Sequence, residues 1–286
     1  MSDIKINESV LAEKAQKFDK FVHFIDKNDQ PISFLNPDGV LDREEGYKRN
    51  KPSRSQEILN EFEWNESWIG SGKIKERIFK VMDIADNLVN FNARIDFRKH
   101  FETDLKDYNP ESEQVIYEIY KGDDDKAAFE HAIQVFGARY SVLAYLFFVK
   151  DSNKYLPASP KNFDKAFSEL NINFAMANKY SWDNYCQFIY IIREIGKLIP
   201  KYMNISHKVS LLDAHSFVWI IREEKFIDWN PVMTDINTYM KPKSIIEADG
   251  SVRYQCPRCD VFFKHAERCP VCGQIVIKRS DGYVNR

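Results

Sequence analysis

Hydrophobic and polar positions alternate with helical spacing over most of residues 1–242. Between Glu8 and Lys27, apolar residues recur every three or four positions, which predicts an amphipathic helix that ends near Lys27. A second periodic stretch covers residues 72–101, and its spacing predicts a helix hairpin. Its Lys and Arg residues between Lys73 and Lys99 suit a solvated face better than a DNA groove. The two stripes consist of Val10, Leu11, Ala15, Phe18, Val22 and Phe24, and of Ile74, Ile78, Met82, Ala85 and Val89.

Several later helices begin with residues that cap a first turn. Asp residues precede the stretch AAFEHAIQVF, and Ser159 stands before Pro160, which suits a first helical position. Ser181 is the predicted N-cap of the next helix. Ser210 and Asp213 have the spacing of a capping box, with Asp in place of the preferred Glu. These signals predict a mainly α-helical body.

The stretch from Gln30 to Ser55 lacks this helical spacing. It combines residues that break helices with several basic residues, so the pattern predicts a long, partly basic loop. The breakers are Pro31, Pro37, Gly39, Gly46 and Pro52, and the basic residues are Arg43, Lys48, Arg49, Lys51 and Arg54.

The pattern changes to period two near Lys243. The stretch SIIEADGSVRYQC predicts a β-hairpin that turns at Asp249 and Gly250. We therefore expect a mainly α fold with a helical body over residues 1–242 and a β-hairpin with a zinc ribbon over residues 243–286. The body has room for two subdomains, divided near residues 108–122.

The overall charge places a limit on the partners of the chain. Its 41 Lys and Arg residues nearly balance 43 Asp and Glu residues, for a formal net charge of −2, so any contact with nucleic acid must depend on a local patch. The N-terminal segment lacks the features of a signal peptide. The longest apolar run, from Tyr140 to Val149, is far shorter than the ~20 residues of a membrane span. We expect a cytoplasmic protein without a membrane segment.

Four cysteines near the C-terminus form two Cys-x2-Cys pairs, separated by nine residues. Two such hooks can turn four thiolates toward one tetrahedral centre, and without an export signal a metal is favoured over disulfides. The stretch from about Arg253 to Lys278 resembles a zinc ribbon. The resemblance implies a structural Zn²⁺ held by Cys256, Cys259, Cys269 and Cys272. Iron, as in rubredoxin-like sites, is the less favoured occupant because such sites separate their knuckles by a longer loop.

The predicted ribbon is the basic part of the chain. Its Lys and Arg residues outnumber its acids, and Phe262 and Phe263 interleave with them as a stacking surface for bases would. The two Phe residues also suit a small ribbon core, and a ribbon that docks on a larger protein or only staples the fold explains the pattern too. The candidate nucleic-acid-binding residues are Arg253, Arg258, Lys264, His265, Arg268, Lys278 and Arg279.

Other catalytic signatures are weak or absent in the sequence. It contains no phosphate-binding loop, dinucleotide-binding glycine pattern, paired metal-binding His motif or nucleophile elbow. A metal-dependent nuclease needs converging carboxylates, and acids such as Asp38, Asp42 and Glu45, or those between Arg222 and Lys225, are the candidates.

Three further residues invite a catalytic interpretation. Asp213 and His215 stand two apart on a predicted helix and so face different directions. We expect Asp213 to serve the helix cap, His215 to be a hydrogen-bonded core residue, and Cys186 to be a small buried hydrophobic residue.

Two segments of the body, ARYSVLAYLFFVKDSNKYLPASPKNFDKAF and SLLDAHSFVWII, are similar to segments of uncharacterised bacterial proteins, some of them near HNH nucleases or restriction-type defence genes. The resemblance implies a DNA-related context. The HNH motif itself is missing, so no catalytic residue carries over. The sequence thus predicts a zinc-containing, non-catalytic protein that binds or targets nucleic acid, in a bacterial defence system. The alternatives are a nuclease with a diverged carboxylate site and a protein adaptor that docks through its ribbon.

Overall fold

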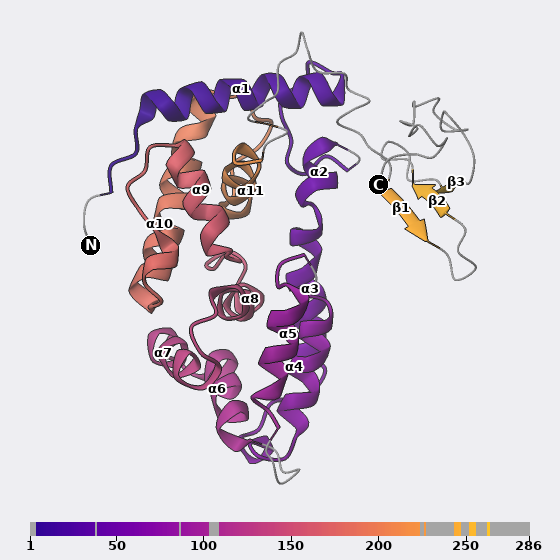
Figure 1. Ribbon diagram of the computed structural model, residues 1–286, viewed down its shortest axis with the longest axis vertical. Helices are drawn as coiled ribbons and strands as arrows, with labels where there is room; N and C mark the ends of the chain where they lie inside the picture. The colour runs from indigo at the N-terminus through magenta and orange to yellow at the C-terminus, as the bar shows by residue number, and fades with distance from the viewer. Residues whose placement is uncertain are drawn as a thin grey trace.

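The structure is a computed structural model of the 286-residue chain. It describes residues 4–37, 39–85, 87–102, 109–223 and 226, together with the backbone of three short strands at 243–246, 252–255 and 262–263. The described residues are mainly α-helical, as expected (Figure 1). Their helices are α1 Glu8–Asp26, α2 Val40–Glu45, α3 Tyr47–Asn60, α4 Lys73–Asp83, α5 Phe91–Lys99, α6 Pro110–Lys121, α7 Asp125–Phe136, α8 Tyr140–Lys150, α9 Pro160–Glu169, α10 Trp182–Leu198 and α11 Leu211–Ile221, with 3₁₀ turns η1 Glu66–Trp68, η2 Met176–Asn178 and η3 Ile199–Lys201.

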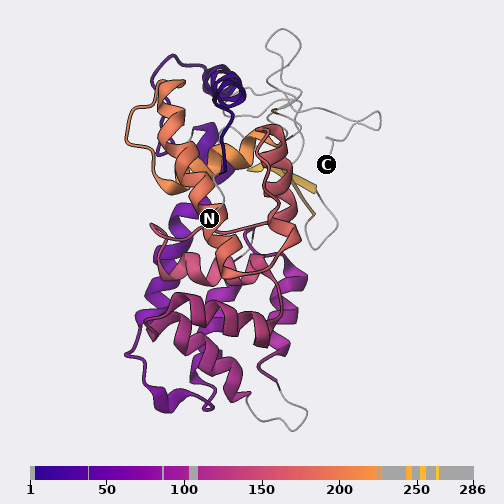
Figure 2. The same ribbon diagram turned by 90° about the vertical axis from the view of Figure 1, so that its left-hand side faces the viewer.

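Helix α8 lies at the centre of the helical body. Its residues Tyr140 and Val142–Val149 are all buried, because α3, α5, α6 and α7 pack against it. In Figure 1 it is seen nearly end-on, with α1 running across the top of the body above α9, α10 and α11. Figure 2, turned by 90°, shows the indigo α1 nearly end-on instead. The apolar run that is too short for a membrane is therefore the central core helix.

One cluster of buried hydrophobic residues extends from Leu11 to Phe226. It includes residues on both sides of the segment 108–122, where α6 begins and packs against α7 and α8. The division of the chain into domains stays a prediction.

The predicted loop between Gln30 and Ser55 is wrong. Helices α2 and α3 occupy most of it, and the residue between them, Gly46, has right-handed helical angles (φ −58°, ψ −31°). Glycine is needed there for space, because a Cβ atom would lie 2.6 Å from the carbonyl oxygen of Asp42. Pro52 lies inside α3 and removes only one backbone donor. The apolar spacing of a helix is absent from the sequence here, because two of the buried positions carry the charged residues Glu45 and Lys48.

The predicted caps before α7, at Ser181 and at Ser210 are confirmed. The side chains of Asp124 and Ser181 cap α7 and α10, and Ser210 forms the capping box of α11. Ser159 precedes α9 at the expected position but makes no side-chain cap bond. The stretch 72–101 contains two helices, α4 and α5, as a hairpin requires, and Arg98 on α5 pairs with Asp83 at the end of α4.

The three strands form one antiparallel sheet in the order β1, β2, β3, with bounds Lys243–Ile246, Val252–Gln255 and Phe262–Phe263. Strand β1 pairs with β2 in the register that joins Ile246 to Val252, which confirms the predicted hairpin pairing. The predicted turn at Asp249 and Gly250 lies outside the described residues. No helix among the described residues is both long and apolar enough to cross a membrane.

Candidate functional site

Most of the predicted site residues lie outside the described part of the chain. These are the four cysteines, Cys256, Cys259, Cys269 and Cys272, and the candidate nucleic-acid-binding residues Arg258, Lys264, His265, Arg268, Lys278 and Arg279. Arg253 lies on β2, of which only the backbone is described. The described residues contain no group of three or more His, Cys, Asp or Glu side chains that could hold a metal.

The pairing of β2 with β3 bears on the first cysteine pair. Gln255 pairs with Phe262 in antiparallel register, so the chain reverses direction between these two residues. Cys256 and Cys259 both belong to that connection by sequence. Both cysteines lie outside the described residues, so the zinc knuckle stays a prediction from their spacing.

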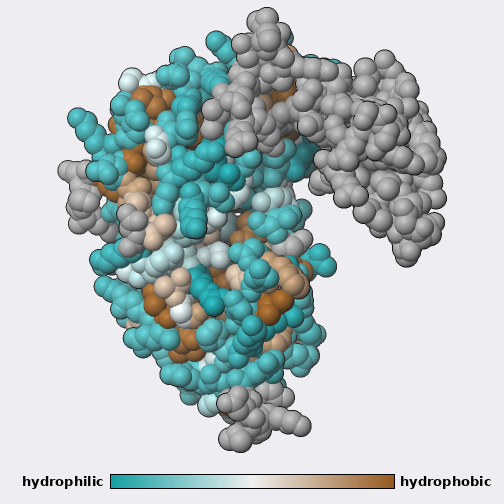
Figure 3. Space-filling model, viewed as in Figure 1, coloured by the Kyte–Doolittle hydropathy of each residue, from teal (hydrophilic) through white to brown (hydrophobic). Residues whose placement is uncertain are grey.

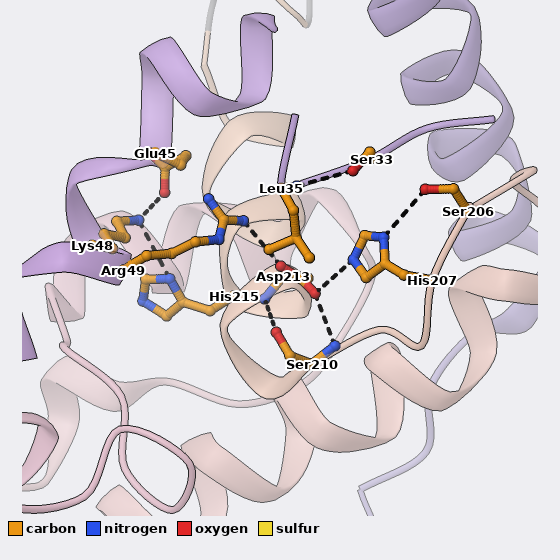
Figure 4. Close-up of polar contacts among 10 residues, drawn as sticks. All are labelled: Ser33, Leu35, Glu45, Lys48, Arg49, Ser206, His207, Ser210, Asp213 and His215. Carbon is orange, nitrogen blue, oxygen red and sulfur yellow. Dashed lines mark hydrogen bonds and ion pairs between the residues drawn. The ribbon is translucent and has the colours of Figure 1, made fainter. Parts of the chain in front are cut away.

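Within the helical body, a cluster of charged and polar side chains is buried between α3 and α11 (Figure 4). The ammonium group of Lys48 donates a hydrogen bond to the carboxylate of Glu45. It also lies 3.4 Å from Nδ1 of His215 and 4.9 Å from the ring centroid of Trp219. The other ring nitrogen of His215, Nε2, lies 2.9 Å from the carbonyl oxygen of Pro157. Since a carbonyl can only accept, Nε2 carries the proton and Nδ1 is free to accept from Lys48.

Burial determines the protonation preferences in this cluster. It raises the pKa of Glu45 and lowers the pKa of Lys48, while the ion pair between them acts in the opposite direction on both groups. Burial also holds the pKa of His215 well below its usual value, and the nearby Lys48 charge adds to the effect. His215 is therefore the neutral, hydrogen-bonded core residue that the sequence predicts.

A second group of contacts centres on Asp213, which is 1% exposed. Its Oδ1 lies 3.0 Å from Nη2 of Arg49, and its Oδ2 accepts from the backbone N–H of Ser210 at 2.9 Å. Oδ2 also lies 3.2 Å from Nε2 of His207. Asp213 thus serves the helix cap, as predicted, and Lys48 and Arg49 tie α3 to α11 at two neighbouring points.

The cavity beside this cluster is too small for a substrate. Lys48, His215, Phe163 and Trp219 line it together with residues of the loops before α5 and α9, and its volume is about 20 Å³. That volume holds about one water molecule, whereas ligand pockets occupy about 300–1,000 Å³. The cluster therefore joins helices and offers no room for catalysis.

The acids of the nuclease alternative do not converge in the described part of the chain. Glu45 forms a buried ion pair with Lys48, Asp42 is half-buried, and Asp38 lies outside the described residues. Arg222 at the end of α11 stacks on Trp219, with its guanidinium carbon 3.8 Å from the ring centroid. The residues that follow Glu223 in the stretch REEK are not described.

Cys186 on α10 is half-buried, a little more exposed than predicted. Burial raises the pKa of its thiol to about 11. The thiolate needed for nucleophilic or metal chemistry is disfavoured there.

Sequence reasoning missed Lys48 and Glu45 as core partners. The available signal was their separation by three positions, which places two opposite charges on one face of a helix. The expected loop hid that signal.

No protein-family model, no curated protein and no solved structure matches the chain.

Proposed function

We propose that the protein is a non-catalytic nucleic-acid-binding protein whose C-terminal zinc ribbon makes the contact. The observation that carries the proposal is the pair of Cys-x2-Cys hooks, the first of which stands between the paired residues Gln255 and Phe262. The four thiolates would hold one Zn²⁺ with no open coordination position, which favours a structural metal.

The basic residues of the predicted ribbon supply the attraction to phosphate. Arg258, Lys264 and Arg268 lie between or within the two hooks, and Phe262 and Phe263 of β3 stand among them in the sequence. Basic side chains that alternate with aromatic ones suit a surface that neutralises phosphates and stacks bases.

The helical body supports a non-catalytic role. Its buried polar cluster joins α3 to α11, and the cavity beside that cluster is too small for a substrate. The resemblance of two body segments to proteins near restriction-type genes favours a DNA-related context such as bacterial defence. In that setting the ribbon would bind DNA, and the helical body would hold the ribbon in place or recruit a partner protein.

The proposal is tested by binding of the full-length, zinc-loaded protein to labelled duplex DNA, single-stranded DNA and RNA at two salt concentrations. The variant Arg258→Ser/Lys264→Ser/Arg268→Ser should bind at least tenfold more weakly, because each phosphate that is no longer neutralised weakens binding. A matched control, Arg193→Ser/Lys197→Ser/Lys201→Ser, removes three exposed cations around the end of α10 and should bind as the wild type does.

Failure of the wild-type protein to bind any of these nucleic acids would overturn the proposal. A partner protein that co-purifies only with an intact ribbon would then identify a docking module. Cleavage of nucleic acid that requires Mg²⁺ and is abolished in Asp42→Asn would instead reveal a nuclease.

A further inference from the structure

A second surface with aromatic and basic side chains lies at the opposite end of α3 from the buried cluster. An open groove of about 330 Å³ is formed there by the end of α3, the turn η1 and helix α4. Its volume falls at the lower end of the range for ligand pockets. The groove is lined by Glu61, Phe62, Trp68, Lys73, Glu76, Arg77 and Lys80.

Arg77 holds the two aromatic rings of the groove in place. Its guanidinium carbon lies 5.0 Å from the ring centroid of Phe62 and 4.6 Å from that of Trp68. It donates hydrogen bonds to the carbonyl oxygens of Phe62 and Leu59, at 3.1 and 3.4 Å. Only 7% of Arg77 is exposed, so its guanidinium is buried behind the two rings, and the rings line the groove. The sequence pattern suggested a solvated basic face here, which is wrong for Arg77.

The aromatic surface remains accessible to a ligand. Phe62 is 61% exposed, and Trp68 is half-buried. On the face of the molecule seen in Figure 3, hydrophobic residues lie in separate small patches on a hydrophilic surface. An aromatic pair fixed over a guanidinium differs from such scattered apolar residues, because it presents rigid ring faces next to positive charge.

The positive charge of the groove is only partly neutralised. Glu61 and Glu76 of the groove lining act on the charge of Arg77, and the ammonium group of Lys73 lies 5.3 Å from the Trp68 ring centroid. Lys80 pairs with Glu76 at 3.3 Å, but both side chains are more than half exposed. An exposed pair of this kind is weak and exchanges readily for a stronger anion.

We propose that this groove binds single-stranded nucleic acid. A base would stack on the exposed ring face of Phe62 or Trp68, and the flanking phosphates would lie near Lys73 and Lys80. A duplex keeps its bases stacked inside, so the groove selects a single strand. The contact uses residues other than those of the ribbon and stands or falls separately from the ribbon's role.

Photo-crosslinking tests the contact directly. The full-length, zinc-loaded protein is mixed with single-stranded oligonucleotides that carry 5-iodouracil, a base that crosslinks to stacked aromatic side chains, and the adducts are mapped by mass spectrometry. The expected adduct lies on Phe62 or Trp68. Adducts confined to other parts of the chain, or none, would overturn the proposal.

Matched variants measure the contribution of the groove to affinity. Phe62→Ala/Lys73→Ser/Lys80→Ser should weaken binding of oligothymidylate by about tenfold or more, since each stacked base contributes about 1–3 kcal/mol. The control Phe91→Ala/Lys99→Ser/Lys126→Ser removes one exposed aromatic and two exposed cations elsewhere, and should change affinity less than twofold. Thermal unfolding verifies that both variants fold.

The outcomes separate the groove from the ribbon. If the ribbon variant no longer binds duplex DNA and keeps the adduct on Phe62 or Trp68, both surfaces bind. If the groove variant binds oligothymidylate as the wild type does, the groove proposal fails and the ribbon proposal is untouched. Polyglutamate and unlabelled oligothymidylate can each be tested as competitors of labelled oligothymidylate. If polyglutamate competes equally well, the groove proposal fails, because the site would then bind acidic peptides and need no bases.

Discussion

Replacing Lys48 with methionine should remove the positive charge that faces Glu45 in the core. The side chains of Lys48 and Glu45 are 1% and 2% exposed, so the carboxylate left behind would have neither water nor a counter-ion. Breaking a buried ion pair from one side costs about 3–5 kcal/mol. Methionine keeps much of the aliphatic stem that packs near Trp219, so we expect the free energy of unfolding at pH 7 to fall by about 3–5 kcal/mol.

The double variant Glu45→Leu/Lys48→Met separates the stranded charge from the loss of packing. Replacing both partners of a buried pair with apolar residues is often neutral, or stabilising by about 1–4 kcal/mol. We therefore expect the free energy of unfolding of the double variant to be no more than about 1 kcal/mol below that of the wild type. The free-energy losses of the two single changes should not add up in the double variant.

Guanidinium chloride unfolding, followed by far-UV circular dichroism, measures all three variants. Because burial raises the pKa of Glu45, its carboxyl group in Lys48→Met takes up a proton as the pH falls, and the cost should shrink between pH 7 and pH 5. The three variants are Lys48→Met, Glu45→Leu and the double change. If Lys48→Met loses less than about 1 kcal/mol in free energy of unfolding, or if the double variant is less stable than either single variant, the claim of a buried ion pair is refuted.

Three further predictions concern Glu113, His215 and Cys269. The buried carboxylate of Glu113 accepts hydrogen bonds from the backbone N–H groups of Gly70, Gly72 and Lys75 at the start of α4, so Glu113→Ala should cost about 3 kcal/mol in urea unfolding, with Glu111→Ala as an exposed control. Burial and the Lys48 charge keep the pKa of His215 well below its usual value, so the unfolded chain binds a proton that the folded chain does not. Stability should then fall below about pH 6.5 by up to about 1.4 kcal/mol per pH unit, and His215→Gln should flatten this dependence in unfolding curves between pH 7 and pH 5. The proposed ribbon would hold one Zn²⁺ per chain, so elemental analysis should find less zinc in Cys269→Ser than in the wild type, and the helical circular dichroism signal should stay unchanged because the helical body has its own core.

Each of these three predictions has an outcome that contradicts it. Equal stability of Glu113→Ala and Glu111→Ala would mean that Glu113 does not hold the start of α4. An unchanged pH dependence in His215→Gln would mean that the folded protein can protonate His215. Full zinc content in Cys269→Ser would remove this residue from the ligand set.

The fold is predictable from sequence where apolar spacing and a capping residue coincide. The helix that starts after Ser210 has both signals and is correct, down to the roles of Asp213 and His215. Helices α2 and α3 were missed because Gly46 and Pro52 ordinarily break helices, yet here Gly46 keeps right-handed angles and Pro52 removes a single bond. Local pattern cannot reveal such positions, because packing against the rest of the body makes them helical.

The candidate sites show the same limit for long-range contacts. Lys48 meets His215 across 167 positions of sequence, and no local rule predicts that a lysine in a basic stretch will be buried. Arg77 was expected on a solvated face with Lys73 and Lys80, which are exposed, but Phe62 and Trp68 pack against its guanidinium and it is buried. The cysteine hooks are a different case, because that prediction depends only on short spacings in the sequence, and it stays a prediction.

The salt dependence of nucleic-acid binding tests the central claim most directly. For the zinc-loaded wild type, the logarithm of the binding constant should fall linearly with the logarithm of salt concentration. In Arg258→Ser/Lys264→Ser/Arg268→Ser the slope should be smaller by about one for each phosphate that the variant no longer neutralises, while the α10 control variant keeps the wild-type slope. Identical slopes in all three proteins, or no binding by the wild type, would contradict the account.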